Sequence, residues 1–258
     1  MKYIEYFHLH SMWSKYDVCW DNIRPDVNIL VGINGAGKTT FLNNIYDYYT
    51  KWIGSSHKLV VRATFDATDT NIPIEYIRSF DVPSSSKKNS SPLMAELNKV
   101  VYQNSERFSF FDYLMRPYHY DNETERVKKR IHDFFALIND FFVETNKEIN
   151  FERDLNKLVF YDKQQNIISL EMLSAGEKQL LLILLSVFLM DEKPSVLLMD
   201  EPELSLHIAW QEKLISALRK LNPNCQIILT THSPSIFALG WENNLTFMEE
   251  LYKPLRDA

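Results

Sequence analysis

The residues best suited to chemistry in this chain form a glycine-rich stretch that ends in a lysine and a threonine. Gly32, Gly37, Lys38 and Thr39 occupy the four fixed places of the pattern G-x-x-x-x-G-K-[ST]. Backbone N–H groups at the start of a helix can surround a triphosphate, and glycine lets the backbone curl closely around it. The expected nucleotide-binding residues are Gly32, Ile33, Asn34, Gly35, Ala36, Gly37, Lys38, Thr39 and Thr40.

The same stretch predicts a metal ion beside the nucleotide. Lys38 would neutralise the β and γ phosphates, and the Thr39 hydroxyl would hold Mg²⁺. The second expected metal ligand is Asp200, which ends the apolar run from Ser195 to Met199. Glu201 follows at once and is the expected general base, because a carboxylate there could polarise the water that attacks the γ-phosphate.

A histidine ends another apolar run. Residues 226–231 lead directly into His232, which follows Asp200 by 32 residues, enough for one helix and a return strand. Strand, helix, strand is the pattern of a parallel crossover, so His232 should lie at the same edge of the sheet as Asp200. There it could sense or stabilise the transferred charge, and we take it as a catalytic candidate with Glu201 and Lys38.

The elements that would position these side chains follow from the apolar pattern. Residues 26–31 are expected to form a buried strand before the glycine-rich loop, and residues 40–45 a helix after it. With the runs at 195–200 and 226–231, they indicate an α/β fold with a central, mainly parallel sheet flanked by helices.

Residues 173–177, Leu-Ser-Ala-Gly-Glu, lie between the glycine-rich loop and Asp200, and they resemble the signature motif of ABC-type ATPases. The resemblance implies a P-loop NTPase of the ABC-ATPase type, with an antiparallel β subdomain and an inserted helical lobe. It also implies that Ser174, Gly176 and Glu177 of one copy close over the ATP of a second copy, in a homodimer that sandwiches the nucleotide.

The segment after Glu201 separates the subfamilies of this class. Residues 201–207 read Glu-Pro-Glu-x-x-Leu-His, which resembles SMC-like and recombination-repair ATPases and prokaryotic AAA-type ATPases related to the OLD family. ABC transporter subunits usually end this segment in Leu-Asp. The chain is similar to the ATPases of antiviral defence systems of the Septu, retron-associated and PARIS types.

Composition limits the other classes of function. The chain has 258 residues and a net charge of −6, which gives no electrostatic footprint for DNA. The longest apolar stretch, residues 180–190, is too short to span a bilayer, and residues 1–20 carry no signal peptide. Cys19 and Cys225 have no metal spacing. We expect a cytoplasmic protein with no membrane association; DNA binding is possible but charge does not support it.

The chain is expected to form a single domain, residues 1–258, with a nucleotide-binding core of residues 1–83 and 148–258 and a helical lobe of residues 84–147. Helical spacing of apolar residues covers 93–101 and 127–142, and a hairpin at 148–151 and 157–168 returns the chain to the core. The strand at 74–81 ends where ABC ATPases place a glutamine, but residues 79–81 contain none, and Gln103 is the other candidate.

Two further questions remain open in the sequence. The aromatic residue expected near the adenine is either Trp13 or Tyr16. The resemblance implies an ATP-dependent dimer that regulates a separate effector, such as an HNH or TOPRIM-like nuclease. The alternatives are a DNA-repair ATPase that clamps DNA directly and a transporter nucleotide-binding subunit, the second being disfavoured by Leu206-His207 and the missing glutamine.

Overall fold

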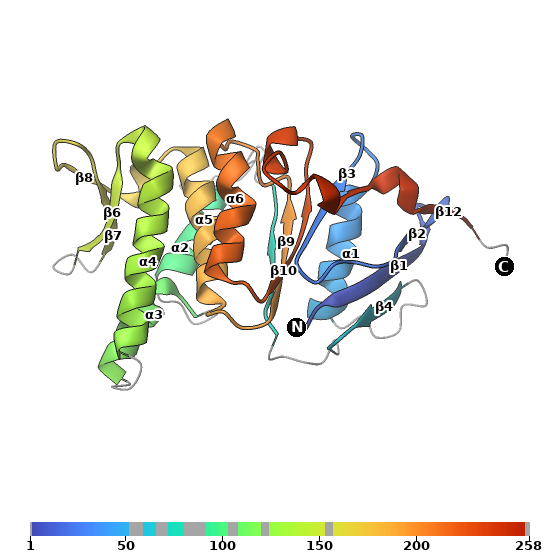
Figure 1. The fold of residues 1–258 in the computed structure, drawn as a ribbon, viewed down its shortest axis with the longest axis horizontal. Coiled ribbons are helices and arrows are strands. Elements are labelled where there is room, and N and C mark those ends of the chain that lie inside the picture. Colours follow the sequence, from blue (N-terminus) through green and yellow to red (C-terminus); the bar gives the residue numbers. More distant parts are fainter. Residues whose placement is uncertain are drawn as a thin grey trace. The chain divides into compact units, whose positions relative to one another are not determined.

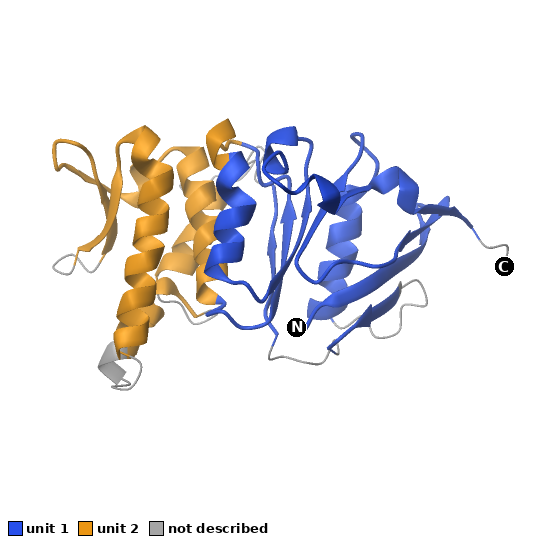
Figure 2. Cartoon of the chain, in the orientation of Figure 1, with its two compact units in different colours: residues 1–79, 190–204, 211–258 blue, residues 80–189, 205–210 orange. Residues whose placement is uncertain are grey.

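The chain divides into two compact units in the computed structural model (Figure 2). The first comprises residues 1–79, 190–204 and 211–258, and the second comprises residues 80–189 and 205–210. The structure describes residues 2–51, 59–65, 72–79, 91–102, 108–119, 124–152 and 157–255.

A five-stranded parallel sheet forms the centre of the first unit (Figure 1). Its strand order is β11 (Leu245–Phe247), β3 (Val27–Val31), β10 (Cys225–Thr230), β9 (Ser195–Asp200) and β5 (Ile74–Ile77). Strands β9 and β10 are buried along their whole length, as the continuous apolar runs of a parallel sheet require. The predicted central parallel sheet is confirmed, and the carboxyl ends of its strands meet at one edge.

An antiparallel sheet of four strands lies in the same unit. Its order is β12 (Tyr252–Pro254), β2 (Tyr16–Trp20), β1 (Ile4–Met12) and β4 (Leu59–Ala63). The core between this sheet and helix α1 (Lys38–Thr50) is aromatic: the Phe41 ring lies 5.2 Å from the Phe7 ring and 6.0 Å from the Trp20 ring. The expected antiparallel β subdomain is therefore present.

Helix α6 (Ile208–Leu221) connects β9 to β10 and completes the expected crossover. Three short 3₁₀ helices, η4 (Pro234–Ile236), η5 (Glu242–Asn244) and η6 (Met248–Leu251), lie between β10 and β12. They carry the chain from the parallel sheet to the antiparallel one.

The second unit consists of helices and a small antiparallel sheet. The helices are α2 (Pro92–Val101), α3 (Phe110–His119), α4 (Thr124–Phe142) and α5 (Ala175–Leu189), with the 3₁₀ helices η2 (Val143–Thr145) and η3 (Leu170–Met172). The sheet contains β6 (Glu148–Glu152), β7 (Lys157–Tyr161) and β8 (Ile167–Ile168). The ring of Phe188, on α5, lies 4.3 Å from that of Phe134 and 4.7 Å from that of Tyr113.

The predicted helices at 93–101 and 127–142 and the hairpin after residue 148 are confirmed as α2, α4 and β6–β7. The hairpin and α5, which the sequence assigned to the nucleotide-binding core, belong to the second compact unit. Helix α3 was not predicted. The strand expected at 74–81 is shorter, because β5 ends at Ile77. Ser79 is described, whereas Phe80, Asp81 and Gln103 lie outside the described residues.

Among the residues that the structure describes, no helix is both long enough and apolar enough to cross a membrane.

Candidate functional site

The glycine-rich loop joins the end of β3 to the start of α1, as the sequence predicted. Gly35 and Gly37 have φ values of 81° and 87°, in the left-handed region that glycine adopts without strain. Gly37 has a second constraint, because a Cβ there would overlap the Met12 side chain and lie 2.7 Å from Cη2 of Trp13. The loop therefore needs glycine at Gly37 for both its backbone and its packing.

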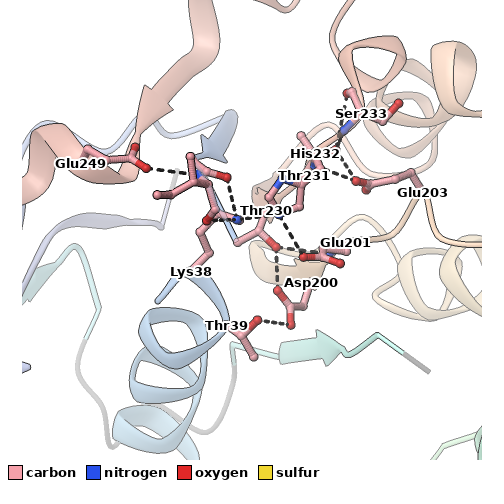
Figure 3. Close-up of polar contacts among 12 residues, drawn as sticks. Lys38, Thr39, Asp200, Glu201, Glu203, Thr230, Thr231, His232, Ser233 and Glu249 are labelled. Carbon is pink, nitrogen blue, oxygen red and sulfur yellow. Dashed lines mark hydrogen bonds and ion pairs between the residues drawn. The ribbon is translucent and has the colours of Figure 1, made fainter. Parts of the chain in front are cut away.

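Lys38 is the first residue of α1, and its side chain is buried beneath the loop. Its Nζ donates to the carbonyl oxygens of Gly32, at 2.9 Å, and Ile33, at 3.3 Å, and lies 2.7 Å from Nε2 of His232 (Figure 3). Burial lowers the pKa of Lys38, while the carboxylates of Glu201 and Asp200 act in the opposite direction. The cation is thus held at the loop among the acidic side chains of the same edge.

Asp200 ends β9 and lies directly opposite Thr230 of β10 in the parallel register. Its two carboxylate oxygens accept hydrogen bonds from hydroxyl groups: Oδ2 from Thr39, at 2.8 Å, and Oδ1 from Thr230, at 2.6 Å (Figure 3). Asp200 and Thr39 therefore form an oxygen-only pair of the kind that Mg²⁺ uses alongside nucleotide phosphates and water. The donor set fits the predicted ion.

Glu201 has a left-handed backbone, with φ of 49°, which is uncommon for a residue with a side chain. Its N–H donates to the Thr230 carbonyl oxygen at 3.2 Å and to the Thr230 hydroxyl oxygen at 3.1 Å. Its Oε1 lies 3.4 Å from Nε2 of His232. Burial raises the pKa of the Glu201 carboxyl, and the neighbouring Asp200 carboxylate raises it further. A raised pKa suits a group that accepts a proton.

The structure thus brings Lys38, Thr39, Asp200, Glu201 and His232 together at the carboxyl edge of one sheet (Figure 3). The sequence pattern located all five, because parallel strands β3, β9 and β10 end at the same edge.

Sequence reasoning missed two acidic residues at this site. Glu203 binds the segment that carries His232, and its only local signal is its place in Glu-Pro-Glu after Asp200. Glu249 accepts a hydrogen bond from the N–H of Ile33 at 3.0 Å. Glu249 also lines an open, mainly apolar pocket of about 580 Å³ that includes Ile33, His232 and Phe247. No sequence spacing connects Glu249 with the loop.

The two aromatic candidates near the loop occupy different places. Trp13 and Tyr16 are 48% and 41% exposed, and Trp13 lies against Gly37. The Tyr16 ring stacks on Tyr252 at 5.0 Å, and the Tyr252 hydroxyl donates to the carbonyl oxygen of Ala36 at 2.5 Å. Trp13 therefore presents an exposed ring beside the start of α1, whereas Tyr16 supports the loop through Tyr252.

The Leu-Ser-Ala-Gly-Glu motif begins helix α5 in the second unit. Ser174 and Glu177 form a capping box: the Ser174 N–H donates to Oε2 of Glu177 at 2.8 Å, and the Glu177 N–H donates to Oγ of Ser174 at 3.2 Å. Lys147 pairs with Oε1 of Glu177 at 2.5 Å. Glu177 is buried and, through these bonds, fixes the start of α5. Ser174 is exposed.

Gly176 packs closely against the backbone of Ser205. A Cβ at Gly176 would overlap the Ser205 carbonyl oxygen, so the motif needs glycine at this position. The signature helix and the segment after Glu201, predicted as separate motifs, are therefore in direct contact at Gly176 and Ser205.

The carboxyl edge of the parallel sheet carries a phosphate loop, an acidic strand end and a histidine, and the chain also has a capped Leu-Ser-Ala-Gly-Glu helix. These features define a P-loop NTPase of the ABC-ATPase type. Residues 79–238 match the protein family described as "AAA domain, putative AbiEii toxin, Type IV TA system". This match covers more than half of the chain, which therefore belongs to that family.

Solved structures agree on the fold. The chain is similar to the SMC head bound to the C-winged helix domain of ScpA, with a TM-score of 0.54, 14% identity, and coverage of 92% of this chain and 91% of that chain. The SMC head domain from Thermotoga maritima gives a TM-score of 0.51, 15% identity and the same coverage, 92% and 91%. At these identities the likeness concerns the fold alone.

Curated relatives confirm the resemblance to Septu and retron-associated ATPases. "Septu protein PtuA" of Bacillus thuringiensis is 23% identical over 283 residues, covering 87% of this chain and 70% of the relative. "Retron Vc95 probable ATPase" of Vibrio cholerae serotype O1 biovar El Tor is 33% identical over 102 residues, covering 34% of this chain and 20% of the relative. "Retron Ec83 probable ATPase" of Escherichia coli is 34% identical over 86 residues, covering 29% and 16%.

Proposed function

We propose that this chain binds Mg²⁺ and ATP at the carboxyl edge of the parallel sheet and hydrolyses ATP to ADP and phosphate. The observation that carries the proposal is the convergence of Lys38, Thr39, Asp200, Glu201 and His232 at that edge. The family and the fold support nucleotide hydrolysis in general. The role of each side chain is our assignment.

In this proposal, the loop amides and Lys38 bind the β and γ phosphates of ATP. Thr39 and Asp200 would hold Mg²⁺, which when bound draws negative charge from the phosphate oxygens. The Lys38 side chain is buried against the carbonyl oxygens of the loop. It therefore needs little rearrangement to reach phosphates bound by the same loop.

Glu201 acts as the general base. It takes a proton from water as the water oxygen bonds to the γ-phosphorus, and the bond from that phosphorus to the bridging oxygen of ADP breaks. The raised pKa of Glu201 favours this transfer. His232, whose Nε2 lies 3.4 Å from Oε1 of Glu201, would interact with the γ-phosphate and the attacking water.

The exposed Ser174 and the N-terminus of α5 would complete the site of a second copy. A helix N-terminus favours negative charge, and the capping box holds the Ser174 hydroxyl in place there. We therefore propose a homodimer that sandwiches ATP, in which Ser174 and Gly176 of one copy face Lys38 and Thr39 of the other. Glu177 supports Ser174 from within its own chain.

We propose further that ATP-driven closure of this dimer regulates a separate effector in bacterial antiviral defence, with an HNH or TOPRIM-like nuclease as the expected partner. The similarity to a Septu protein and to retron ATPases supports this role. The net charge of −6 makes a direct DNA clamp the weaker alternative. The proposed location is the cytoplasm.

The test is co-expression of the tagged chain with its neighbouring genes, followed by mass spectrometry of what co-purifies and native mass measurement with ATP. Glu201→Gln should accumulate the closed dimer, and Ser174→Arg, which places a bulky cation at the exposed helix start, should prevent it. Recovery of a nuclease-like protein with the dimer supports the effector role. A dimer that binds DNA in a salt-dependent manner supports the clamp, and recovery of a membrane permease contradicts both.

A further inference from the structure

Glu203 is a buried carboxylate that accepts hydrogen bonds from two consecutive residues, Thr231 and His232. The residue as a whole is only 8% exposed. Its Oε1 accepts the Thr231 hydroxyl at 2.7 Å and the His232 backbone N–H at 2.8 Å (Figure 3). One oxygen therefore fixes the main chain from which the His232 imidazole extends.

The contact is part of a closed ring of hydrogen bonds. The Thr231 hydroxyl oxygen accepts the Ser233 N–H at 2.9 Å, and the Ser233 hydroxyl donates to Oε1 of Gln211 at 2.6 Å. The Gln211 side-chain amide donates to the Glu203 carbonyl oxygen at 3.5 Å, which is the weakest bond of the ring. The ring connects Gln211 on α6 with the segment after β9 and the segment after β10.

Glu203 has more acceptor capacity than this ring uses. Its Oε2 is buried and has no hydrogen-bond partner among the residues that the structure describes. Burying a carboxylate with one unsatisfied oxygen destabilises a fold, so this side chain is not placed here for stability alone. The position of the carboxylate beside the His232 backbone therefore indicates a role at the site.

The imidazole position depends on this anchor. Nε2 of His232 lies 2.7 Å from Nζ of Lys38 and 3.4 Å from Oε1 of Glu201. Glu203 is only two residues from Glu201, so one short segment carries both the expected base and the group that holds the histidine. A displacement of the Thr231–Ser233 segment would move His232 away from both partners at once.

We propose that Glu203 is a positioning residue for ATP hydrolysis, whose Oε1 sets the place of His232 relative to Lys38 and Glu201. The proposal rests on the proposed ATPase function. It assigns to Glu203 no contact with nucleotide and no proton transfer. Loss of its acceptor should therefore slow the chemical step and leave nucleotide binding by the phosphate loop intact.

The experiment measures kcat, KM and the Kd of a fluorescent ATP analogue for wild type, Glu203→Ala and Glu203→Gln. Misplacing a group by about 1 Å can reduce rates by about 100-fold, so Glu203→Ala should lower kcat by about 10- to 100-fold with Kd unchanged. Glu203→Gln retains an oxygen that can accept the same two hydrogen bonds, so kcat should stay within about threefold of wild type; the small loss is expected because a neutral acceptor forms these bonds more weakly. Glu212→Ala on α6 is the matched control and should have wild-type kcat.

A second pair of variants keeps the test independent of the stability of Glu203→Ala. Thr231→Val removes the hydroxyl from the ring and should lower kcat in the same way, whereas Thr231→Ser should restore it. Wild-type kcat in Glu203→Ala or in Thr231→Val would overturn the proposal, and so would a Glu203→Gln variant as slow as Glu203→Ala. If the wild-type chain binds ATP but does not hydrolyse it, the proposed function fails first, and the role of Glu203 fails with it.

Discussion

Gly176 packs directly against the backbone of Ser205, with no room for a Cβ between them. Ser205 itself has a left-handed backbone, with φ of 70°. This contact joins the start of the signature helix to the segment that follows Asp200 and Glu201 along the chain. A change at either residue should therefore affect the other, which gives the two motifs a direct physical connection within one polypeptide.

Replacing Gly176 with alanine should force these two backbones apart. Overpacking of a tight contact destabilises a protein by about 1–3 kcal/mol, so Gly176→Ala should lower the free energy of unfolding by that amount. ATP hydrolysis should fall with it, while binding of ATP to the phosphate loop should be retained. Urea unfolding and phosphate release measure the two effects. An alanine variant with wild-type stability would show that the contact is not tight in solution.

The ion pair between the partly buried Lys147 and the buried Glu177 should make stability depend on pH. Burial alone raises the pKa of the Glu177 carboxyl, but the bonds from Lys147 and Ser174 outweigh it and hold the pKa below the ordinary glutamate value. A depressed pKa in the folded state means that the stabilisation is present above the unfolded pKa of about 4.3 and is lost as pH falls below it.

Lys147→Met leaves the Glu177 carboxylate buried without its cation, which should cost about 3–5 kcal/mol at pH 7. The difference from wild type should narrow at pH 3.5, below the unfolded glutamate pKa, because the variant lacks the Lys147 bond that lowers the pKa of Glu177 and its carboxyl takes up a proton more readily. Lys128→Met is the control, because its exposed pair with Glu125 should contribute under about 1 kcal/mol. Urea unfolding at both pH values measures the effect, and a difference that is the same at both would contradict the account.

Trp13 should contribute more than Tyr16 to nucleotide affinity. Its exposed ring beside Gly37 can stack on adenine, and aromatic stacking contributes about 0.5–1.5 kcal/mol, so Trp13→Ala should weaken ATP binding by about 2- to 10-fold. Inorganic tripolyphosphate, which has no base, should bind both proteins equally. Calorimetric titration distinguishes the two residues, and a larger loss in Tyr16→Ala would assign the adenine to Tyr16 instead.

The sequence predicted the residues of the parallel sheet edge because their positions depend on local pattern and one topological rule. Buried runs ending at Val31, Asp200 and Thr230 become parallel strands, and parallel strands place their carboxyl ends together. The side chains that follow each run must then meet. No further information about packing was required.

Other features depend on contacts that sequence spacing does not encode. Lys147 and Glu177 are separated by 30 residues in the sequence, and Glu249 and Ile33 by 216, although the members of each pair are hydrogen-bonded. Helix α3 did carry a local signal, since Ser109 and Asp112 exchange capping bonds at its start. Its aromatic content and Pro117 obscured the helical pattern. The role of Glu203 appears only once β9, β10 and α6 are placed together.

The most direct test of the central claim is magnesium-dependent phosphate release from ATP by wild type and Glu201→Gln, with ATP affinity measured on the same samples. Removal of a general base typically lowers the rate by about 100- to 10,000-fold, so Glu201→Gln should be slower by at least about 100-fold while binding ATP as tightly as wild type. It should also accumulate as an ATP-bound dimer. Hydrolysis by Glu201→Gln at the wild-type rate would contradict the assignment of the site.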